Sequence, residues 1–337
     1  MGSMYYRFLL AGALLVSAVP GLRASSDPTS QQLLDSVIRQ HNFIQAARAP
    51  FALEAEFTGQ ANVPLQGHFR IRWQSKDHWW TRVEFGPFQQ IRIRNGEMEY
   101  IARNYEFTPL QIVNLYTLFG IDGALTTFPV GKTINRIEAG ISVICLQGHP
   151  DRSSKIVHEF CVDSSSHDLL NESWNPTLDQ SRRRHFADYV QADGIRYPAR
   201  LEMFMNSSKM ISARITEFKS MPFDSDLLTP PKGAMERRRC ADYKPPVPLK
   251  KIKQDNIRFG NRPWTGQEIL VMTVLTDGSA SDVHVIQSGG SSFDKLAIKS
   301  FTNVKFKPAM CGNVPVVEDF MVELNYETLT YRRPGRR

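Results

Sequence analysis

Apolar and polar residues alternate through much of the sequence, a two-residue period that is typical of strands with one buried face. The alternation is clear in residues 51–57, 65–73, 78–85 and 91–100, and it returns in five segments between residues 141 and 218. Asn95-Gly96 separates two alternating segments, and this dipeptide is a strong hairpin signal. Residues 27–222 are therefore predicted to form a long antiparallel sheet.

Two segments with helical spacing accompany these strands. The first begins near Pro28, which is tolerated in the first turn of a helix. Its apolar stripe consists of Leu33, Leu34, Val37, Ile38, His41 and Ile44. The second follows Thr108-Pro109 and includes Leu110, Val113, Leu115, Leu118 and Phe119. Because an antiparallel sheet with one apolar face needs a cover on that face, we expect these helices to pack on it.

A separate pattern begins after residue 265 and has the order hairpin, helix, strand. Ile269, Val271, Thr273 and Leu275 alternate with other residues at the period of a half-buried strand, and Asp277-Gly278 is a tight-turn pair. A second strand covers residues 282–287, and a helix follows in which Ser291 or Ser292 is placed to cap the first turn. Phe320, Val322, Leu324 and Tyr326 alternate again in a closing strand. The pattern predicts a small α+β domain.

Composition sets the domain organisation. The chain has 337 residues, which is room for two domains, and 42% of them are hydrophobic, as in ordinary globular proteins. Prolines and basic residues are frequent in residues 223–250, so this segment is predicted to be a linker. We expect a first domain over residues 27–222, a second over residues 251–331 and a basic tail over residues 332–337.

The first 26 residues have the features of an export signal. Arg7 precedes a short apolar segment, residues 8–19, which is shorter than a membrane-spanning helix, and small residues follow. The segment is therefore predicted to be a signal peptide or a short membrane anchor, and the protein to be exported. The net charge of +7 would suggest nucleic acid, but the arginine clusters lie in connecting or terminal segments and the chain is predicted to be exported. We therefore expect no nucleic-acid partner.

The four cysteines are expected to form two disulfides, because an even number in an exported chain favours oxidation. Cys145 and Cys161 lie in neighbouring predicted strands, and Cys240 and Cys311 would join the linker to the last loop of the second domain. The alternative is a zinc site formed by Cys145, His149, His158 and Cys161. Alternate residues of adjacent strands point to opposite faces, which argues against that site.

The C-terminal pattern resembles the C-terminal domain of the TonB family. The matching residues are Asp277-Gly278, Val283 to Val285, Ser288-Gly289, Phe293-Asp294, Ala297, Phe306-Lys307-Pro308-Ala309, Gly312, Pro315-Val316 and the strand Phe320 to Tyr326. The resemblance implies that an edge of its sheet pairs with an extended peptide, such as the TonB-box segment of an outer-membrane transporter. Strand addition of this kind uses the unpaired backbone groups of an edge strand. The expected edge is formed by Phe320, Val322, Glu323, Leu324 and Tyr326.

The N-terminal sheet resembles the LolA-like half-barrels of exported lipoprotein carriers. The resemblance rests on the N-terminal helix, on the strand with Gly67, Phe69, Ile71 and Trp73, on the following aromatic strand, and on the hairpin leading to Tyr100. It implies a curved sheet that can hold a lipid or lipoprotein acyl chain. Trp73, Trp79, Trp80 and Phe85 could line such a site, although aromatic residues of this kind more often simply pack a core.

No group of residues in the sequence has the pattern of an active site. Ser292-x-x-Lys295 matches a nucleophile motif, but the partner motifs of the enzymes that use it do not occur. We expect no enzyme activity, cofactor or metal. The sequence therefore favours a periplasmic TonB-family protein that binds peptides of transporters or other envelope proteins, with energy coupling if it stays attached to the inner membrane. The alternative is a soluble lipid or lipoprotein carrier or sensor that uses the TonB-like domain for docking.

Overall fold

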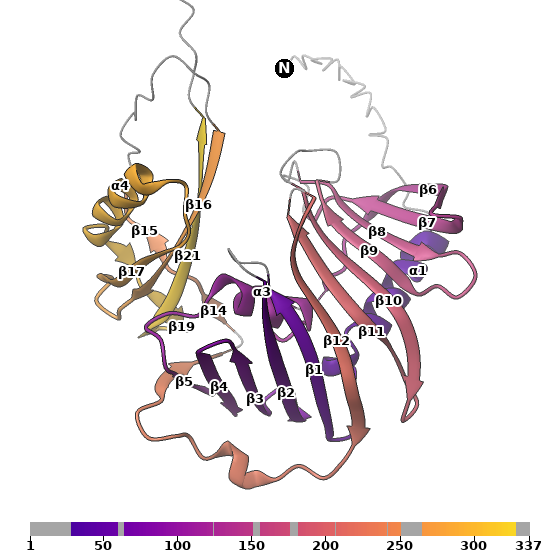
Figure 1. Cartoon of the computed structure of the whole chain (residues 1–337), viewed down its shortest axis with the longest axis horizontal. Coiled ribbons are helices and arrows are strands. Elements are labelled where there is room, and N and C mark those ends of the chain that lie inside the picture. Colours follow the sequence, from indigo (N-terminus) through magenta and orange to yellow (C-terminus); the bar gives the residue numbers. More distant parts are fainter. Residues whose placement is uncertain are drawn as a thin grey trace, which may run out of the picture.

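A computed structural model describes residues 28–59, 64–123, 125–150, 156–175, 181–205, 207–240, 242–250 and 265–327. The predicted export segment, the basic tail and residues 251–264 of the predicted second domain lie outside these described residues. Figure 1 shows a large curved sheet and a smaller C-terminal unit beside it. The predicted fold class, a curved antiparallel sheet with packed helices followed by a small α+β domain, is confirmed.

Thirteen of the described strands form the large antiparallel sheet. One half has the strands β1 (Phe51–Gly59), β2 (Leu65–Ser75), β3 (His78–Phe85), β4 (Phe88–Asn95) and β5 (Met98–Arg103). The other half has β6 (Val130–Glu138), β7 (Ile141–Gly148), β8 (His158–Asp163), β9 (Leu169–Trp174), β10 (Arg182–Ala192), β11 (Ile195–Met205) and β12 (Ser208–Ser220). The thirteenth strand is β13 (Met235–Arg238). The order is β13-β5-β4-β3-β2-β1-β12-β11-β10-β9-β8-β7-β6, so β1 and β12 are neighbours at its centre.

Three helices cover one face of this sheet, which we call the inner face. They are α1 (Pro28–His41), α2 (Phe43–Ala46) and α3 (Leu110–Leu118). The predicted stripe of the first helix is largely buried, with Leu34 and Val37 at most 1% exposed. These residues share one continuous core with the inner faces of strands from both halves of the sheet. We call this sheet and its helices the half-barrel domain.

The segment predicted as a linker contains regular structure. The short helix η1 (Ser225–Leu228) lies near β3 and β4, and β13 (Met235–Arg238) pairs with the edge of β5. Farther along, β14 (Tyr243–Lys244) and β15 (Val247–Pro248) pair with strands of the C-terminal unit. The chain therefore leaves the half-barrel domain as an added edge strand, and it enters the C-terminal domain within a few residues.

The C-terminal domain is built around a three-stranded sheet of order β17-β16-β21. These strands are β16 (Thr265–Val274), β17 (Ala280–Gln287) and β21 (Glu318–Glu327), and α4 (Ser291–Thr302) packs on one face. Three short strands complete the domain: β18 (Phe306–Lys307), β19 (Ala309–Cys311) and β20 (Val314–Val316). The predicted order of hairpin, helix and strand is confirmed.

Two details of this domain differ from the sequence prediction. The N-cap of α4 is Gly290, and its first turn has no side-chain cap from Ser291 or Ser292. Asp294 instead accepts hydrogen bonds from Ser288 Oγ at 2.7 Å and from the backbone N of Gly289 at 3.2 Å. In β16, the residues that face α4 are Leu270, Met272 and Val274, one register away from the predicted apolar face. The strand is apolar on both sides, so its periodicity does not identify the core face.

Candidate functional site

The predicted docking strand is an outer strand of the C-terminal sheet. β21 pairs along its length with β16, from Glu318 opposite Val274 to Glu327 opposite Thr265. No further strand follows β21 in the order of this sheet, as far as the chain is described. An outer strand of this kind presents backbone donors and acceptors to which an extended peptide can be added.

Alternation along β21 divides its side chains between the two faces of the sheet. Phe320, Val322 and Leu324 pack into the core beneath α4, and the Phe320 ring lies 5.4 Å from the Phe306 ring. Glu323 points to the other face and forms an ion pair with Arg182 at the start of β10. The backbone of Tyr326 continues the pairing with β16, while its side chain lies outside the described part of the structure.

The start of β21 is joined to the half-barrel domain by a chain of ion pairs. Arg237 and Arg239 both form ion pairs with Glu318. Asp319 forms ion pairs with Arg237 and with Arg103, the latter at 3.2 Å. Arg239 Nε also lies 2.7 Å from Glu99 Oε2. We call this group, together with Arg92 and Asp122, the arginine network; its members are Arg92, Arg103, Arg237, Arg239, Glu99, Asp122, Glu318 and Asp319.

Arg92 extends the arginine network into the half-barrel domain. Its Nε donates to Glu99 Oε1 at 2.8 Å, and its two Nη atoms donate to the two carboxylate oxygens of Asp122 at 2.5 and 2.9 Å. Burial would raise the pKa of Glu99, but Arg92 and Arg239 lower it to about 2. Burial opposes ionisation of Asp319 as well, and Arg237 with Arg103 lowers its pKa below the usual value. Glu99 and Asp319 are therefore held in their ionised form despite their burial.

The aromatic residues predicted to line an apolar ligand site are divided between core and outer face. Trp73, Trp79 and Phe85 are 2%, 6% and 4% exposed and belong to the inner core, where Trp73 lies directly opposite Trp79. Trp80 is half-buried on the other side of β3. Three of the four residues therefore face the helices that cover the inner face.

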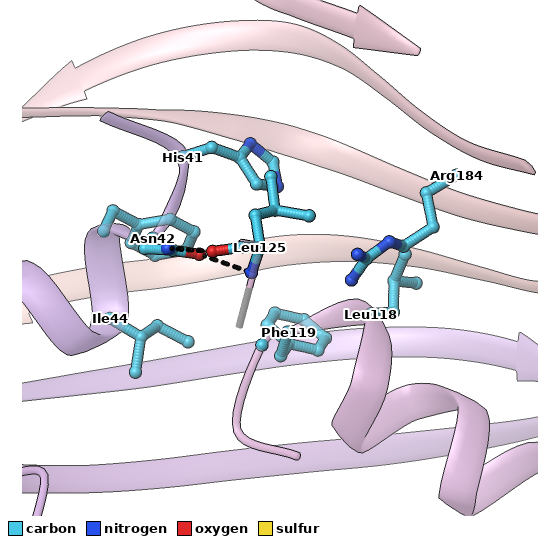
Figure 2. Close-up of a pocket in the computed structure, with 9 residues that line it drawn as sticks. His41, Asn42, Ile44, Leu118, Phe119, Leu125 and Arg184 are labelled. Carbon is cyan, nitrogen blue, oxygen red and sulfur yellow. Dashed lines mark hydrogen bonds between the residues drawn. The ribbon is translucent and has the colours of Figure 1, made fainter. Parts of the chain in front are cut away.

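A small cavity lies on the inner face. Figure 2 shows a cavity between α2 and the loop after α3, lined among others by His41, Phe119 and Arg184. Its volume is about 10 Å³, room for roughly one water molecule. Asn42 donates to the Leu125 carbonyl and accepts from the Leu125 backbone N, both at 3.0 Å, so it fixes the loop across the cavity (Figure 2). An acyl chain would fit in this cavity only after the loop or a helix had moved.

A buried polar cluster lies beside that cavity. Glu172 accepts from Arg184 Nε and lies 2.9 Å from His158 Nε2, and Arg184 Nη1 donates to the Thr117 carbonyl of α3 at 2.9 Å. Burial and the nearby Arg184 charge lower the pKa of His41 to about 3, so its imidazole is neutral. The Nδ1 atom of His41 and the Nε1 atom of Trp73 are buried without a hydrogen-bond partner. The core of the half-barrel domain therefore contains two polar atoms that a ligand or a water could satisfy.

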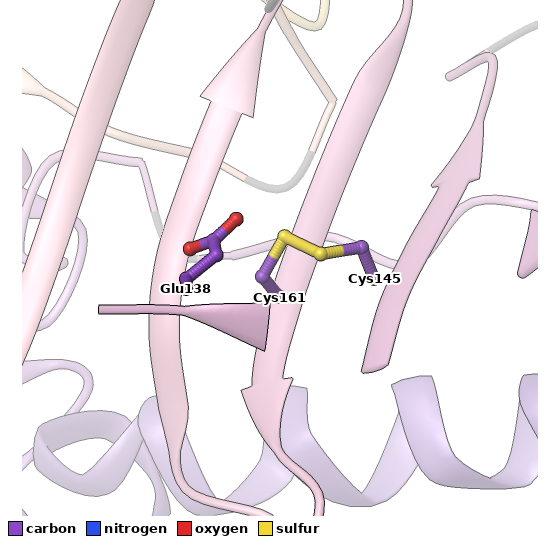
Figure 3. Close-up of side chains that lie close together, drawn as sticks. All are labelled: Glu138, Cys145 and Cys161. Carbon is purple, nitrogen blue, oxygen red and sulfur yellow. A yellow bond between two sulfur atoms is a disulfide. The ribbon is translucent and has the colours of Figure 1, made fainter. Parts of the chain in front are cut away.

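Both predicted disulfides are present. Cys145 and Cys161 are direct cross-strand partners in β7 and β8, and Figure 3 shows the bond between them with Glu138 nearby. Cys240 bonds to Cys311, which ties the end of β13 to β19. This second bond lies directly after Arg239, so a covalent link and the arginine network join the two domains at the same place.

The alternative zinc site is not assembled by the structure. His158 faces the inner core and pairs with Glu172, whereas Cys161 lies on the opposite face of β8 with Cys145. His149 is exposed and hydrogen bonds to the Ile156 carbonyl at 3.0 Å. Within the described residues, the group with ligand-like proximity is Glu138 with the two bonded cysteines, whose sulfurs are not thiolates (Figure 3).

The C-terminal domain is of the TonB type. Residues 261–328 match the family model described as Gram-negative bacterial TonB protein C-terminal, and this match confirms the resemblance found in the sequence. It covers the β17-β16-β21 sheet, α4 and the short strands β18 to β20. A search of the curated proteins found no match to the chain.

Several solved structures match the chain at low sequence identity. A LolA superfamily protein from Nitrosomonas europaea is 13% identical with a TM-score of 0.38, and covers 58% of this chain and 97% of its own. A DUF1329 family protein from Desulfovibrio piger is 9% identical with a TM-score of 0.40, and covers 60% of this chain and 96% of its own. At these values the likenesses identify neither a ligand nor a partner. No helix in the described residues is long and apolar enough to span a membrane.

Sequence reasoning missed the arginine network. Arg237 and Arg239 belong to the arginine clusters that the sequence places in connecting segments, and the sequence predicted no role for Glu318 or Asp319. Their partners lie far away in the chain, so periodicity gives no sign of the pairing. The sequence signal for this pairing lies in the charge composition: two adjacent carboxylates in a basic chain are expected to pair with arginines, which can be distant in sequence.

Proposed function

We propose that the protein is an exported, non-enzymatic envelope protein whose C-terminal domain captures an extended peptide by adding it as a strand beside β21. The supporting observation is the outer position of β21 in a sheet that matches the TonB C-terminal family. Backbone hydrogen bonds would give the affinity, and side chains at alternate positions the specificity. A TonB-box-like segment of an outer-membrane transporter is the partner class that the resemblance implies.

Proline substitutions test the docking edge. Neighbouring N–H groups of an edge strand point alternately toward its partner strand and outward. Of Val322→Pro and Glu323→Pro, the variant that removes the outward N–H is therefore expected to abolish binding of a TonB-box peptide while the domain stays folded. The other variant is expected to destabilise the domain.

Calorimetric titration of the peptide and thermal unfolding of each variant measure these two effects. Val322→Ala is the control, because it shortens a core side chain and leaves the backbone donor intact. If both proline variants stay folded and bind the peptide as the unsubstituted protein does, docking does not use β21.

A second function, transport or sensing of a lipid or lipoprotein by the half-barrel domain, is favoured by the unsatisfied Trp73 Nε1 and His41 Nδ1 atoms in its core. An acyl ester or amide could supply the acceptor that Trp73 Nε1 lacks, and an amide could also supply a polar partner for His41 Nδ1, once the inner face opened. Native mass spectrometry of the protein purified from membranes without organic solvent would detect a stoichiometric lipid. A ligand-free spectrum under these conditions, and no binding of added lipid, would contradict this second function.

Attachment to the membrane decides between energy coupling and free diffusion. If residues 1–26 remain on the mature protein, they could anchor it at the inner membrane, and force could reach a docked transporter. Sequencing the N-terminus of the mature protein, together with cell fractionation, distinguishes the two cases. A mature N-terminus beyond residue 18 and a soluble periplasmic fraction would exclude anchoring by this segment.

A further inference from the structure

Arg237 lies at the start of the candidate docking strand. Its guanidinium contacts Glu318 and Asp319 at the start of β21, with Nη1 3.4 Å from Glu318 Oε1 and Nη2 on Asp319. Successive side chains of a strand point to opposite faces, so one group that reaches both carboxylates must pass around an edge or around the end of the strand, and Glu318 is the first residue of β21. β16 occupies the inner edge of β21, where Val274 is opposite Glu318. The guanidinium therefore lies at the start of β21, at the end of the path that an added strand would follow.

The arginine network that starts at this point has equal numbers of positive and negative groups and is largely buried. It contains four arginines and four carboxylates joined by consecutive ion pairs. The side chains of Arg237 and Arg103 are 6% exposed, that of Glu318 is 8% exposed and that of Glu99 is 2% exposed. Removing one partner leaves a buried charge uncompensated, so a change at one end disturbs its neighbours in the network.

The far end of the network lies on the loop that closes the half-barrel domain. Asp122 follows α3 in the segment between α3 and β6, and this segment includes Phe119 and Leu125 of the cavity lining. Side chains of the N-terminal helical region hold the same segment from the other side, with Asn42 on Leu125 and Gln31 Oε1 accepting from the Val130 backbone N at 3.0 Å. Arg92 of β4 therefore holds this loop from the opposite side through its ion pair with Asp122.

We propose that the arginine network is an interdomain latch: Arg237 partly blocks the docking edge of β21, and its displacement by an added strand loosens the loop that closes the half-barrel domain. The proposal rests on the proposed strand addition at β21. The latch would couple the two domains, because binding of a peptide at β21 would open the inner face of the half-barrel domain. Because such coupling is reciprocal, loosening the loop must also raise the affinity of β21 for the peptide.

The first test measures peptide affinity in latch variants of the full chain. Arg237→Gln uncovers the edge, and Asp122→Asn weakens the far end without touching β21. Both are expected to bind a synthetic TonB-box peptide about fivefold more tightly or better, the lower range of typical coupling. Glu54→Gln is the matched control, since it removes a similarly exposed carboxylate that pairs with Arg72 in the half-barrel sheet. Unchanged affinity in Asp122→Asn would overturn the coupling, and unchanged affinity in Arg237→Gln would overturn the blocking of the edge.

The second test does not need a peptide. Hydrogen–deuterium exchange of residues 119–123 and 125–128 is expected to rise about fivefold or more in Arg237→Gln and to stay unchanged in Glu54→Gln. If Arg237→Gln does not fold, Asp122→Asn serves in the reverse direction, with faster exchange expected at the start of β21. Changes confined to the substituted domain would overturn the latch. If no variant binds peptide, strand addition at β21 fails, and the exchange data alone decide whether the domains are coupled.

Discussion

At the scale of single residues, Gly278 shows how closely the turn between β16 and β17 is packed. Its φ is 77°, and a Cβ atom there would lie 2.0 Å from the Phe306 carbonyl oxygen. We expect Gly278→Ala to destabilise the C-terminal domain by about 1–2 kcal/mol through the left-handed backbone and by about 1–3 kcal/mol more through the clash. Gly96→Ala is the control, since Gly96 has a φ of 62° and open space around it. If denaturant unfolding shows that Gly278→Ala and Gly96→Ala lose the same free energy of unfolding, the clash with Phe306 has no role.

His41 is expected to make the half-barrel domain sensitive to acid. Its folded-state pKa of about 3 lies below the ordinary value of 6.5, so the unfolded chain binds the proton more readily. The stabilisation by neutral His41 is complete above the ordinary pKa, and it is lost as the pH falls from 6.5 towards 3. Between about pH 7.5 and about pH 5, this residue should remove about 2 kcal/mol of unfolding free energy.

The variant His41→Leu isolates that contribution. Leucine can keep an apolar contact with Phe186, whose ring centroid lies 4.0 Å from that of His41. We expect the free energy of unfolding of the variant to vary less with pH over this interval. His167→Asn is the matched control, because His167 is exposed with a φ of 59°, a conformation that asparagine tolerates. Parallel pH profiles for His41→Leu and the unsubstituted protein would exclude the role assigned to His41.

At the scale of elements, the two disulfides should differ in their effect on stability. Cys240–Cys311 closes a loop with a separation of 71 residues, and Cys145–Cys161 one of 16 residues. Loop-closure entropy predicts losses of about 4 and about 3 kcal/mol when the respective pairs are replaced by serine. Peptide mapping without reductant checks the two bonds. Denaturant unfolding of both double-serine variants measures which one loses more free energy of unfolding. A smaller loss for Cys240→Ser with Cys311→Ser would contradict the entropic account.

The sequence was informative about single elements and less so about their arrangement. Alternation and the Asn95-Gly96 and Asp277-Gly278 pairs predicted the hairpins, because these signals act over a few residues. The core face of β16 was not predictable, since Leu270 and Ile269 are both apolar. The cap of α4 was wrongly predicted because the N-cap is Gly290, which has no side chain to accept a hydrogen bond and gives no capping signal in the sequence. The arginine network depends on tertiary proximity, which a local pattern does not encode.

At the scale of the whole molecule, β13 completes the half-barrel domain. It covers the edge of β5, and η1 lies near β3 and β4. A chain that ends at residue 222, the predicted domain boundary, would leave β5 as an uncovered edge, and we expect it to self-associate. A chain that ends at residue 239 retains β13 and should remain monomeric. Size-exclusion chromatography with light scattering compares the two, and equal monomeric mass would show that β5 needs no cover.

The central position of β1 and β12 in the large sheet has a consequence for how the protein folds. From β1 to β5 and from β6 to β12, each strand pairs with its neighbour in sequence, so both runs can grow by successive local hairpins. The pairing of β1 with β12 instead brings Phe51 beside Ser220. Such a contact closes a very long loop, and folding rates fall as contacts of this kind come to dominate a topology. The rate-limiting event is therefore expected to be the meeting of these two strands, after the hairpins on either side have formed.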